Sequence, residues 1–411
     1  MNVILAIGII MVVGFLGGLA LGKLKLPRIT GYIIVGVLLS PSLLSIIPKE
    51  TIGNLDVITE IALGFIAYLI GGSLYWAQLQ RLAKSIIWIT LLQSLGAWFL
   101  VTLVLAISGH LIIPNGTFWQ TYFPLAFIVG AISCATAPAA TMAIIRQYKA
   151  KGPLTTTLLA VVALDDAVAV IAFAIASGIS QPLVGGASNI SFYQMLGVPF
   201  LHIIESIAIG IVFAVALIYV AKLVRTRELL LVVVLGMIML CTGITNYLGI
   251  SSILAGMVVG FIVVNKVKGA EMFLVVEKIE DVVYAVFFVL AGLHFDLSVL
   301  KVAGILALLI VVTRYTGKYM GARAGARISH APDSVKRYLG LALLPQAGVA
   351  MGLVLLAEHS FPAFGAIMLN GVLASVIINE VITPPLTKYA IFKAGEAGID
   401  LHEKGRGTAT T

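Results

Sequence analysis

Two aspartates stand side by side in the middle of a long apolar run. Asp165 and Asp166 lie within 161–168, where the other residues are valine, alanine and leucine. A carboxylate at the centre of a bilayer costs roughly 2.5–3.5 kcal/mol on insertion scales, and such residues serve ion pathways or proton relays. Adjacent residues on a helix point about 100° apart, so the two carboxylates can serve different neighbours. The pair favours binding of protons or cations over a buried ion pair that only orients helices.

A basic partner for these aspartates lies in another apolar run. Arg314 falls within 311–318, and Lys318 follows one helical turn later. Arginine keeps its charge under ordinary conditions and therefore needs a counter-ion. The sequence predicts that Asp165 or Asp166 pairs with Arg314; the alternative is that Arg314 extends to the cytoplasmic surface. Lys318 is expected to reach that surface along its apolar stem.

Two apolar runs contain a proline among small or polar residues. Pro138 ends the stretch that begins at Ser133, and Pro345 is followed by Gln346 in the second run. A proline inside a helix deletes a backbone hydrogen bond. In lipid the freed carbonyls are tolerated only where other groups or a water-filled cavity satisfy them. One such proline can be an ordinary kink, but two at corresponding positions of two halves indicate broken helices that form a site.

The remaining polar residues narrow the possible chemistry. Glu380 lies deep in the last apolar run and is a candidate for contacting the ion-binding residues rather than the ion itself. Glu60 and Glu205, by contrast, are close to the ends of their apolar runs. The six histidines show no metal-ligand spacing, and no phosphate loop, nucleophile elbow or HExxH motif is present. An intramembrane aspartyl protease would carry its two aspartates on different helices, so we do not expect an enzyme.

The composition is that of a membrane protein. Of 411 residues, 60% are hydrophobic and 11% are charged, whereas soluble domains carry about 25% charged residues. The net charge of +8 comes from basic residues between the apolar runs, so a lipid bilayer is the expected partner and a nucleic acid is not. Cys134 and Cys241 lie in apolar runs and suggest no disulfide framework.

Thirteen apolar runs approach the roughly 20 residues that cross a bilayer. They cover 3–21, 29–47, 53–74, 86–108, 121–145, 154–178, 198–220, 229–248, 250–265, 281–294, 301–322, 337–357 and 363–390. If the N-terminus is outside, almost all basic residues fall in cytoplasmic loops, and the outside loops hold only Lys49 and Lys301. The positive-inside rule therefore predicts an all-α, multi-pass protein of the inner cell membrane with a cytoplasmic C-terminus.

The count of thirteen also suggests internal symmetry. We expect a transmembrane domain over 1–390, made of a repeat at 1–178, a linker helix at 198–220 and an inverted repeat at 229–390, with a short cytoplasmic tail at 391–411. Inverted-repeat transporters place their site where broken helices of the two repeats meet. The fifth and twelfth runs, which contain the two prolines, are the corresponding pair.

These features together resemble the monovalent cation:proton antiporter-2 family, which includes bacterial sodium/proton antiporters and the membrane domain of potassium efflux systems. The resemblance covers about residues 1–390. It rests on four motifs, which are Leu164-Asp165-Asp166, Ala135-Thr136-Ala137-Pro138, 287–297 (FFVLAGLHFDL) and Leu344-Pro345-Gln346-Ala347-Gly348.

The resemblance implies an antiporter that exchanges Na⁺, K⁺ or Li⁺ for protons by alternating access. It implies two crossed broken helices, a homodimer, and no cofactor beyond the transported ions. Asp166 would bind the cation or the proton, Asp165 would pair with Arg314, and Thr136 and Ser133 in the first break would help to coordinate the ion. Many electrogenic relatives have lysine where we place Arg314. The alternative is a sodium-coupled transporter of an organic anion with the same crossed helices.

Overall fold

The computed structural model describes residues 1–23, 28–72, 84–137, 141–142, 144–145, 148–185, 197–224, 226–266, 269–296, 300–346 and 348–398. All regular elements in this part of the chain are helices, as the sequence predicts. The first half contains α1 Val3–Lys23, α2 Arg28–Leu39, α3 Lys49–Gly53, α4 Asp56–Gly72, α6 Lys84–Ile107, α7 Gly109–Ile112, η1 Phe118–Tyr122, α8 Phe123–Ile132 and α10 Pro153–Val184. The second half contains α11 Val198–Ala221, α12 Arg227–Tyr247, α13 Ser252–Val264, α14 Gly269–Glu277, α15 Glu280–Leu293, α16 Leu300–Ile328, α17 Asp333–Tyr338, η4 Leu339–Ala342, α18 Gly348–Ser360 and α19 Gly365–Lys393.

Each of the thirteen expected spans contains a helix of the described residues, but the fifth and the twelfth are interrupted at 133–137 and 343–346. In the described part of the chain, seven helices are long and apolar enough to cross a membrane, namely α1, α6, α10, α11, α12, α16 and α19. The expected second span is too long, because α2 ends at Leu39. Pro41 has no N–H to donate to a helix, and the chain turns there with Ser45 donating its backbone N–H to the Ser40 carbonyl.

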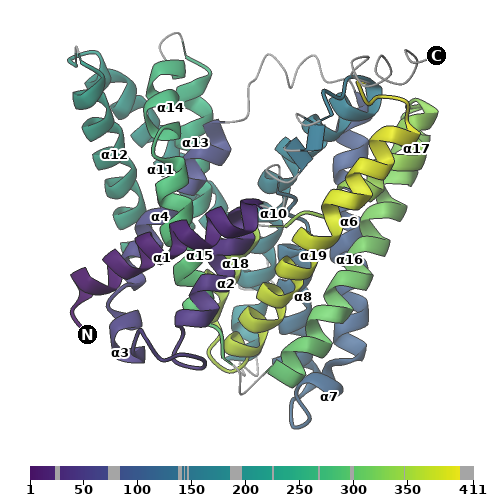
Figure 1. Ribbon diagram of the computed structural model, residues 1–411, viewed down its shortest axis with the longest axis horizontal. Coiled ribbons are helices and arrows are strands. Elements are labelled where there is room, and N and C mark those ends of the chain that lie inside the picture. The colour runs from purple at the N-terminus through teal and green to yellow at the C-terminus, as the bar shows by residue number, and fades with distance from the viewer. Residues whose placement is uncertain are drawn as a thin grey trace, which may run out of the picture.

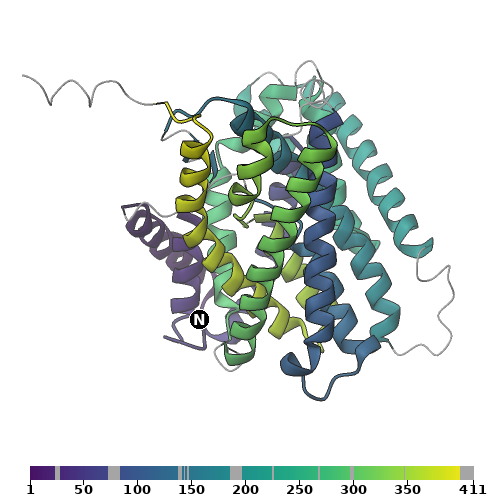
Figure 2. The same cartoon turned by 90° about the vertical axis from the view of Figure 1, so that its right-hand side faces the viewer.

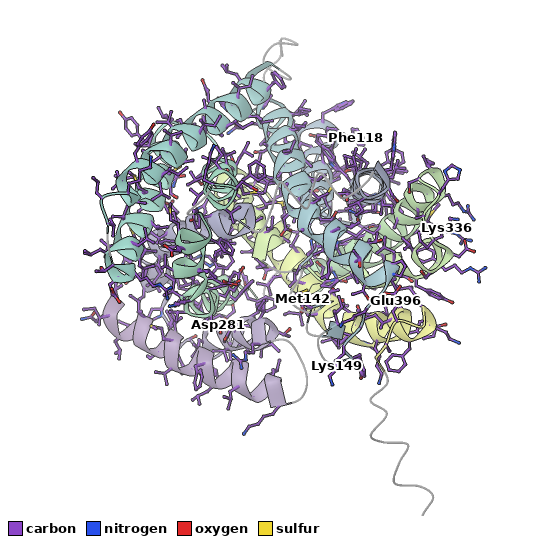
Figure 3. All side chains as sticks on the ribbon, turned by 90° about the horizontal axis from the view of Figure 1, so that it is seen from above. Phe118, Met142, Lys149, Asp281, Lys336 and Glu396 are labelled. Carbon is purple, nitrogen blue, oxygen red and sulfur yellow. The ribbon has the colours of Figure 1, made fainter. Side chains whose placement is uncertain are left out.

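The helices form two groups that lie side by side (Figure 1). One group, here called the core group, consists of α6, α8, α10, α16, α17, η4, α18 and α19, and its largest interface is between α6 and α16. The other, the flanking group, consists of α1, α2, α4, α11, α12, α13, α14 and α15, in which α13 packs on α4 and α15 on α2. Seen from above, Asp281 of α15 and Lys336 of α17 lie on these two different groups (Figure 3).

Glycines allow the long helices α6 and α16 to approach closely. A Cβ on Gly317 would lie 2.5 Å from the Gly96 carbonyl oxygen, and one on Gly321 would lie 2.2 Å from the Leu92 carbonyl oxygen. Such small residues let membrane helices pack backbone to backbone. Figure 2 shows α6, α16 and α19 running together along the core group. This contact fixes the residues of α16 that face the centre of the core group.

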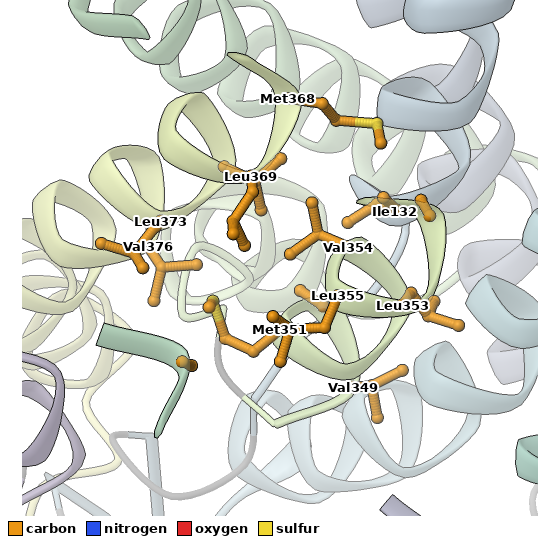
Figure 4. Packing of buried hydrophobic residues seen from close by; sticks show 14 of the residues in the cluster. Ile132, Val349, Met351, Leu353, Val354, Leu355, Met368, Leu369, Leu373 and Val376 are labelled. Atoms are coloured by element: carbon orange, nitrogen blue, oxygen red, sulfur yellow. The ribbon is translucent and has the colours of Figure 1, made fainter. Parts of the chain in front are cut away.

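The buried apolar side chains of the core group hold α18 in place. Figure 4 shows α18 residues such as Met351 and Val354 packed against Leu369 and Leu373 of α19, and near Ile132 at the end of α8. These side chains are at most 1% exposed. Close packing of this kind makes the interior rigid, so α18 itself keeps a fixed position against α8 and α19.

Candidate functional site

Two breaks in the membrane helices meet in the centre of the core group. α8 ends at Ile132, and residues 133–137 are not helical; residues 343–346 lie in the same way between η4 and α18. The backbone N–H of Ala137 donates to the Pro345 carbonyl oxygen over 2.9 Å. The expected span at 337–357 is therefore interrupted next to Pro345, as its proline indicated. Pro138 lies outside the described residues.

Arg314 binds the carbonyls that the breaks leave without helical partners. Its Nε donates to the Ser133 oxygen over 2.9 Å, and its two Nη atoms donate to the Leu344 and Ala135 oxygens over 2.7 and 2.6 Å. The side chain is fully buried. The planar guanidinium presents five donors in a fixed arrangement, so it can bind several carbonyls at once. Arg314 thus joins the two breaks to each other.

The predicted pairing of Arg314 with Asp165 is wrong. Among the described residues, the ion pair of Asp165 is with Lys318, whose Nζ lies 3.1 Å from Oδ2. The expectation that Lys318 reaches the membrane surface is also wrong, because its side chain is 0% exposed. Lys318 Nζ also donates to the Cys134 carbonyl and the Thr136 hydroxyl, both over 2.7 Å.

Two residues of α6 that the sequence analysis did not single out complete the surroundings of Asp165. The Gln93 amide donates to Asp165 Oδ1 and accepts from Lys318 Nζ over 2.8 Å. The Ser94 hydroxyl donates to the same Oδ1 over 3.3 Å, and the Thr136 hydroxyl donates to Oδ2. Both oxygens of Asp165 are therefore occupied by protein donors, and the residue is sealed from water at 0% exposure.

Asp166 has a different environment, although it is the next residue in the chain. It retains 8% exposure and lines a cavity of about 580 Å³ between the two helix groups. The Thr136 backbone N–H, in the first break, faces its carboxylate. The other residues that line the cavity include Ala135, Ala137, Glu277, Glu280 and Tyr284. An ion that enters this cavity can reach Asp166, whereas Asp165 is out of its reach.

The remaining predicted residues lie at or behind the breaks. The Ser133 hydroxyl donates to the Val129 carbonyl of its own helix over 2.7 Å, so that residue contacts the centre through its carbonyl. The Gln346 amide donates to the Ile132 carbonyl over 3.3 Å and accepts from the Asn379 amide over 3.4 Å. Glu380 is 1% exposed and lies next to Asn379 on α19.

A second cavity opens between the helix groups on the other side of Asp166. It measures about 460 Å³, and Asp56, Glu60, His202, Gln181 and His359 are among the residues that line it. On α10, Asp166 lines the first cavity and Phe173, about two turns later, lines the second. On α4, Leu63 lines the second and Ile66 the first. The two cavities thus lie at different levels along the same two helices.

The chain is similar to known proteins over most of its length. The family model described as "Sodium/hydrogen exchanger, transmembrane" matches residues 7–389. The chain is 26% identical over 410 residues to the Na⁺/H⁺ antiporter NhaS4 of Synechocystis, covering 94% of this chain and 95% of that protein. It is 27% identical over 351 residues to cation/H⁺ antiporter 19 of Arabidopsis thaliana, covering 79% of this chain and 42% of that longer protein.

The fold is also that of a solved transporter. The structure of the sodium proton antiporter MjNhaP1 from Methanocaldococcus jannaschii at pH 8 superimposes with a TM-score of 0.77 at 18% identity, covering 95% of this chain and 98% of that one. The likeness in fold, together with the match of the family model over nearly the whole chain, classes it as a transporter and not as an enzyme. This multi-pass membrane protein belongs to the sodium/hydrogen exchanger family of cation/proton antiporters.

Proposed function

We propose that the protein exchanges a monovalent cation, with Na⁺ as the first candidate and K⁺ or Li⁺ as the alternatives, for protons at Asp166. The observation that carries the proposal is the contrast within the aspartate pair. Asp165 is sealed by Lys318, Gln93 and Thr136, whereas Asp166 faces a cavity. Asp166 is therefore the carboxylate that can exchange its ligand, and no cofactor beyond the transported ions is required.

Competition for one carboxylate explains obligatory exchange. Asp166 can hold a proton or a partly dehydrated cation, but a cation requires the ionised form. Backbone groups of the break at 133–137 replace part of the water that the cation loses. Two carbonyls of this break are already held in place, that of Cys134 by Lys318 and that of Ala135 by Arg314. The apparent affinity for the cation is expected to rise with pH until Asp166 is fully ionised.

The two cavities support an alternating-access cycle. The cavity at Asp166 is lined by residues of both helix groups, and the second cavity lies between the same groups. A displacement of the core group against the flanking group would close the first and connect Asp166 to the second. With the N-terminus outside and the protein in the inner cell membrane, Asp166 faces the cytoplasm here, because Glu277 and Glu280 lie next to a predicted cytoplasmic loop.

Inverted repeats account for the pattern of helix contacts. α2 packs on α15 and α4 packs on α13, so the second span of each half contacts the third span of the other. The fourth spans, α6 and α16, contact each other. A two-fold axis between the halves produces such reciprocal contacts. We infer repeats at 1–178 and 229–390 joined by α11, and we expect a homodimer formed through the flanking group.

Transport by purified protein in proteoliposomes tests the proposal. An imposed pH gradient should drive uptake of Na⁺, and Asp166→Asn should abolish it because an amide cannot release a proton. Asp333→Asn is the matched control, since the Asp333 side chain is 78% exposed and forms a surface ion pair with Lys336. Undiminished exchange in Asp166→Asn would defeat the assignment. Repeating the assay with K⁺ and Li⁺ identifies the transported ion.

A further inference from the structure

The second break has an acidic residue beside it, as the first break does. Ile378-Asn379-Glu380-Val381 on α19 matches Leu164-Asp165-Asp166-Ala167 on α10 in pattern, with two polar residues between apolar ones. α10 is the sixth expected span of the first half, and α19 is the sixth of the second half. The two polar pairs therefore stand at corresponding places in the proposed repeats.

The contacts of the two pairs also correspond. In the first half, the Thr136 side chain bonds to Asp165 and the Thr136 backbone N–H faces the Asp166 carboxylate. In the second half, the Gln346 side chain bonds to Asn379 and the Gln346 backbone N–H faces the Glu380 carboxylate. Thus each break directs a side chain to the first residue of a pair and a backbone N–H to the second.

The Glu380 carboxylate has one oxygen that no group of the described residues occupies. Glu380 is 1% exposed, and its Oε1 has no hydrogen-bond partner among the described residues. Leaving a buried charged oxygen without a partner costs more free energy than leaving a neutral one without a partner. The charged group that faces Glu380 is Arg314, whose own donors are directed at carbonyls of the breaks. Oε1 is therefore an open position for a proton.

A row of hydroxyl groups leads from Glu380 toward the C-terminal end of α19. Thr383 and Thr387 are both 0% exposed, and their spacing of three and seven residues places them on the same face of the helix as Glu380. The Thr387 hydroxyl has no hydrogen-bond partner among the described residues. Pro384, inside the helix, has no N–H to donate to the Glu380 carbonyl. Polar atoms thus lie along this face of α19 for about two turns beyond Glu380.

We propose that Glu380 is a second proton-binding site, which is related to Asp166 by the internal symmetry and loses its proton in the same transport cycle. This inference rests on the proposed function of Asp166. When the cation binds Asp166, one proton leaves Asp166 and a second leaves Glu380, whose negative charge is then balanced by Arg314. Two protons therefore cross the membrane in one direction for each cation that crosses in the other. Each cycle consequently moves one net positive charge in the direction of the protons.

The breaks connect the two carboxylates physically. Thr136, whose N–H faces Asp166, precedes Ala137, which donates its N–H to the Pro345 carbonyl over 2.9 Å. Pro345 in turn precedes Gln346, whose N–H faces Glu380. Arg314 binds carbonyls of both breaks. A cation that shifts the backbone at Thr136 consequently shifts the backbone that faces Glu380.

The number of protons exchanged per cation tests this inference. In proteoliposomes with known Na⁺ and pH gradients, the membrane voltage at which net exchange stops gives the stoichiometry. Wild type should exchange two protons per Na⁺, Glu380→Gln should exchange one, and Glu380→Asp should retain two. Glu228→Gln is the matched control, because Glu228 is exposed at the start of α12, and it should behave as wild type.

Two outcomes overturn the inference. One is an unchanged stoichiometry in Glu380→Gln, and the other is a Glu380→Gln protein that still binds Na⁺ but exchanges nothing. If Glu380→Gln does not fold, infrared spectra of wild type with ¹³C-labelled glutamate decide the question. Na⁺ should remove a glutamic acid band as well as an aspartic acid band, and loss of the aspartic acid band alone overturns it. Exchange by Asp166→Asn would refute the proposed function instead, whatever Glu380→Gln does.

Discussion

The buried pair of Lys318 and Asp165 gives a quantitative prediction about stability. The Nζ–Oδ2 distance is 3.1 Å, and both side chains are 0% exposed. At an effective dielectric constant of about 20, two unit charges at this distance attract by about 5 kcal/mol. Removing one partner of a buried pair costs about 3–5 kcal/mol, because the other charge stays buried without compensation. Lys318→Met should therefore destabilise the protein strongly.

A second substitution should restore much of that stability. In Lys318→Met/Asp165→Asn no uncompensated charge remains at the pair, and the amide still accepts from Thr136. We expect the double variant to be less destabilised than the sum of the two single variants, with a coupling free energy of about 2–5 kcal/mol. Chemical unfolding of the detergent-solubilised protein measures each free energy of the cycle.

The parallel cycle with Arg314→Met identifies the true partner of Asp165. Because Arg314 binds carbonyls of the breaks, adding Asp165→Asn should not restore the stability of Arg314→Met. The reasoning is refuted if Asp165→Asn rescues Arg314→Met and not Lys318→Met. It is equally refuted if the effects of Lys318→Met and Asp165→Asn are simply additive.

Three further substitutions probe other contacts. Arg314→Lys should lower the melting temperature and the rate of exchange, because an ammonium group cannot reach three separate carbonyls and each buried unsatisfied one costs about 1–3 kcal/mol; wild-type values in both assays would contradict this. Gly317→Ala should destabilise the folded protein by about 1–3 kcal/mol, since the added Cβ would lie 2.5 Å from a carbonyl oxygen of α6. In Gly236→Ala the added Cβ meets nothing within 4 Å, so this control should leave the melting temperature unchanged. Glu396→Ala should lower the stability of the folded protein by about 0.5–2 kcal/mol, because Glu396 accepts from the Leu154 and Thr155 N–H groups at the start of α10. Exchange should persist in this variant. An unchanged melting temperature would contradict the capping role of Glu396.

The helices and the breaks could be predicted from sequence because their signals are local. An apolar run long enough to span a bilayer can be recognised from hydropathy alone. The proline at 345 marks a position where a helix loses a backbone hydrogen bond. The end of α2 was predicted too late because the apolar run continues past Pro41. Hydropathy does not record that a turn begins there.

The partners of the aspartates could not be predicted, because they depend on how deep each residue lies in the membrane and on which side of its helix it faces. The expected span ended at 322, which put Lys318 close to a membrane surface. α16 continues to Ile328, so Lys318 lies about 15 Å from the helix end. Gln93 and Ser94 meet Asp165 only because α6 packs against α10 and α16. A glutamine within an apolar run is the one local signal that could have indicated α6.

The charge balance at the breaks explains why a monovalent ion suits the site. Lys318 neutralises Asp165, and Gln93 holds that neutral pair together by accepting from the ammonium and donating to the carboxylate. Of the aspartate pair, one negative charge is left, on Asp166, at the cavity. One proton or one monovalent cation cancels that charge, whereas a divalent cation would leave an uncompensated positive charge in a buried setting, which is costly. The adjacent aspartates therefore have separate roles. Asp165 neutralises the positive charge of Lys318, and because that charge is neutralised Asp166 can attract a cation.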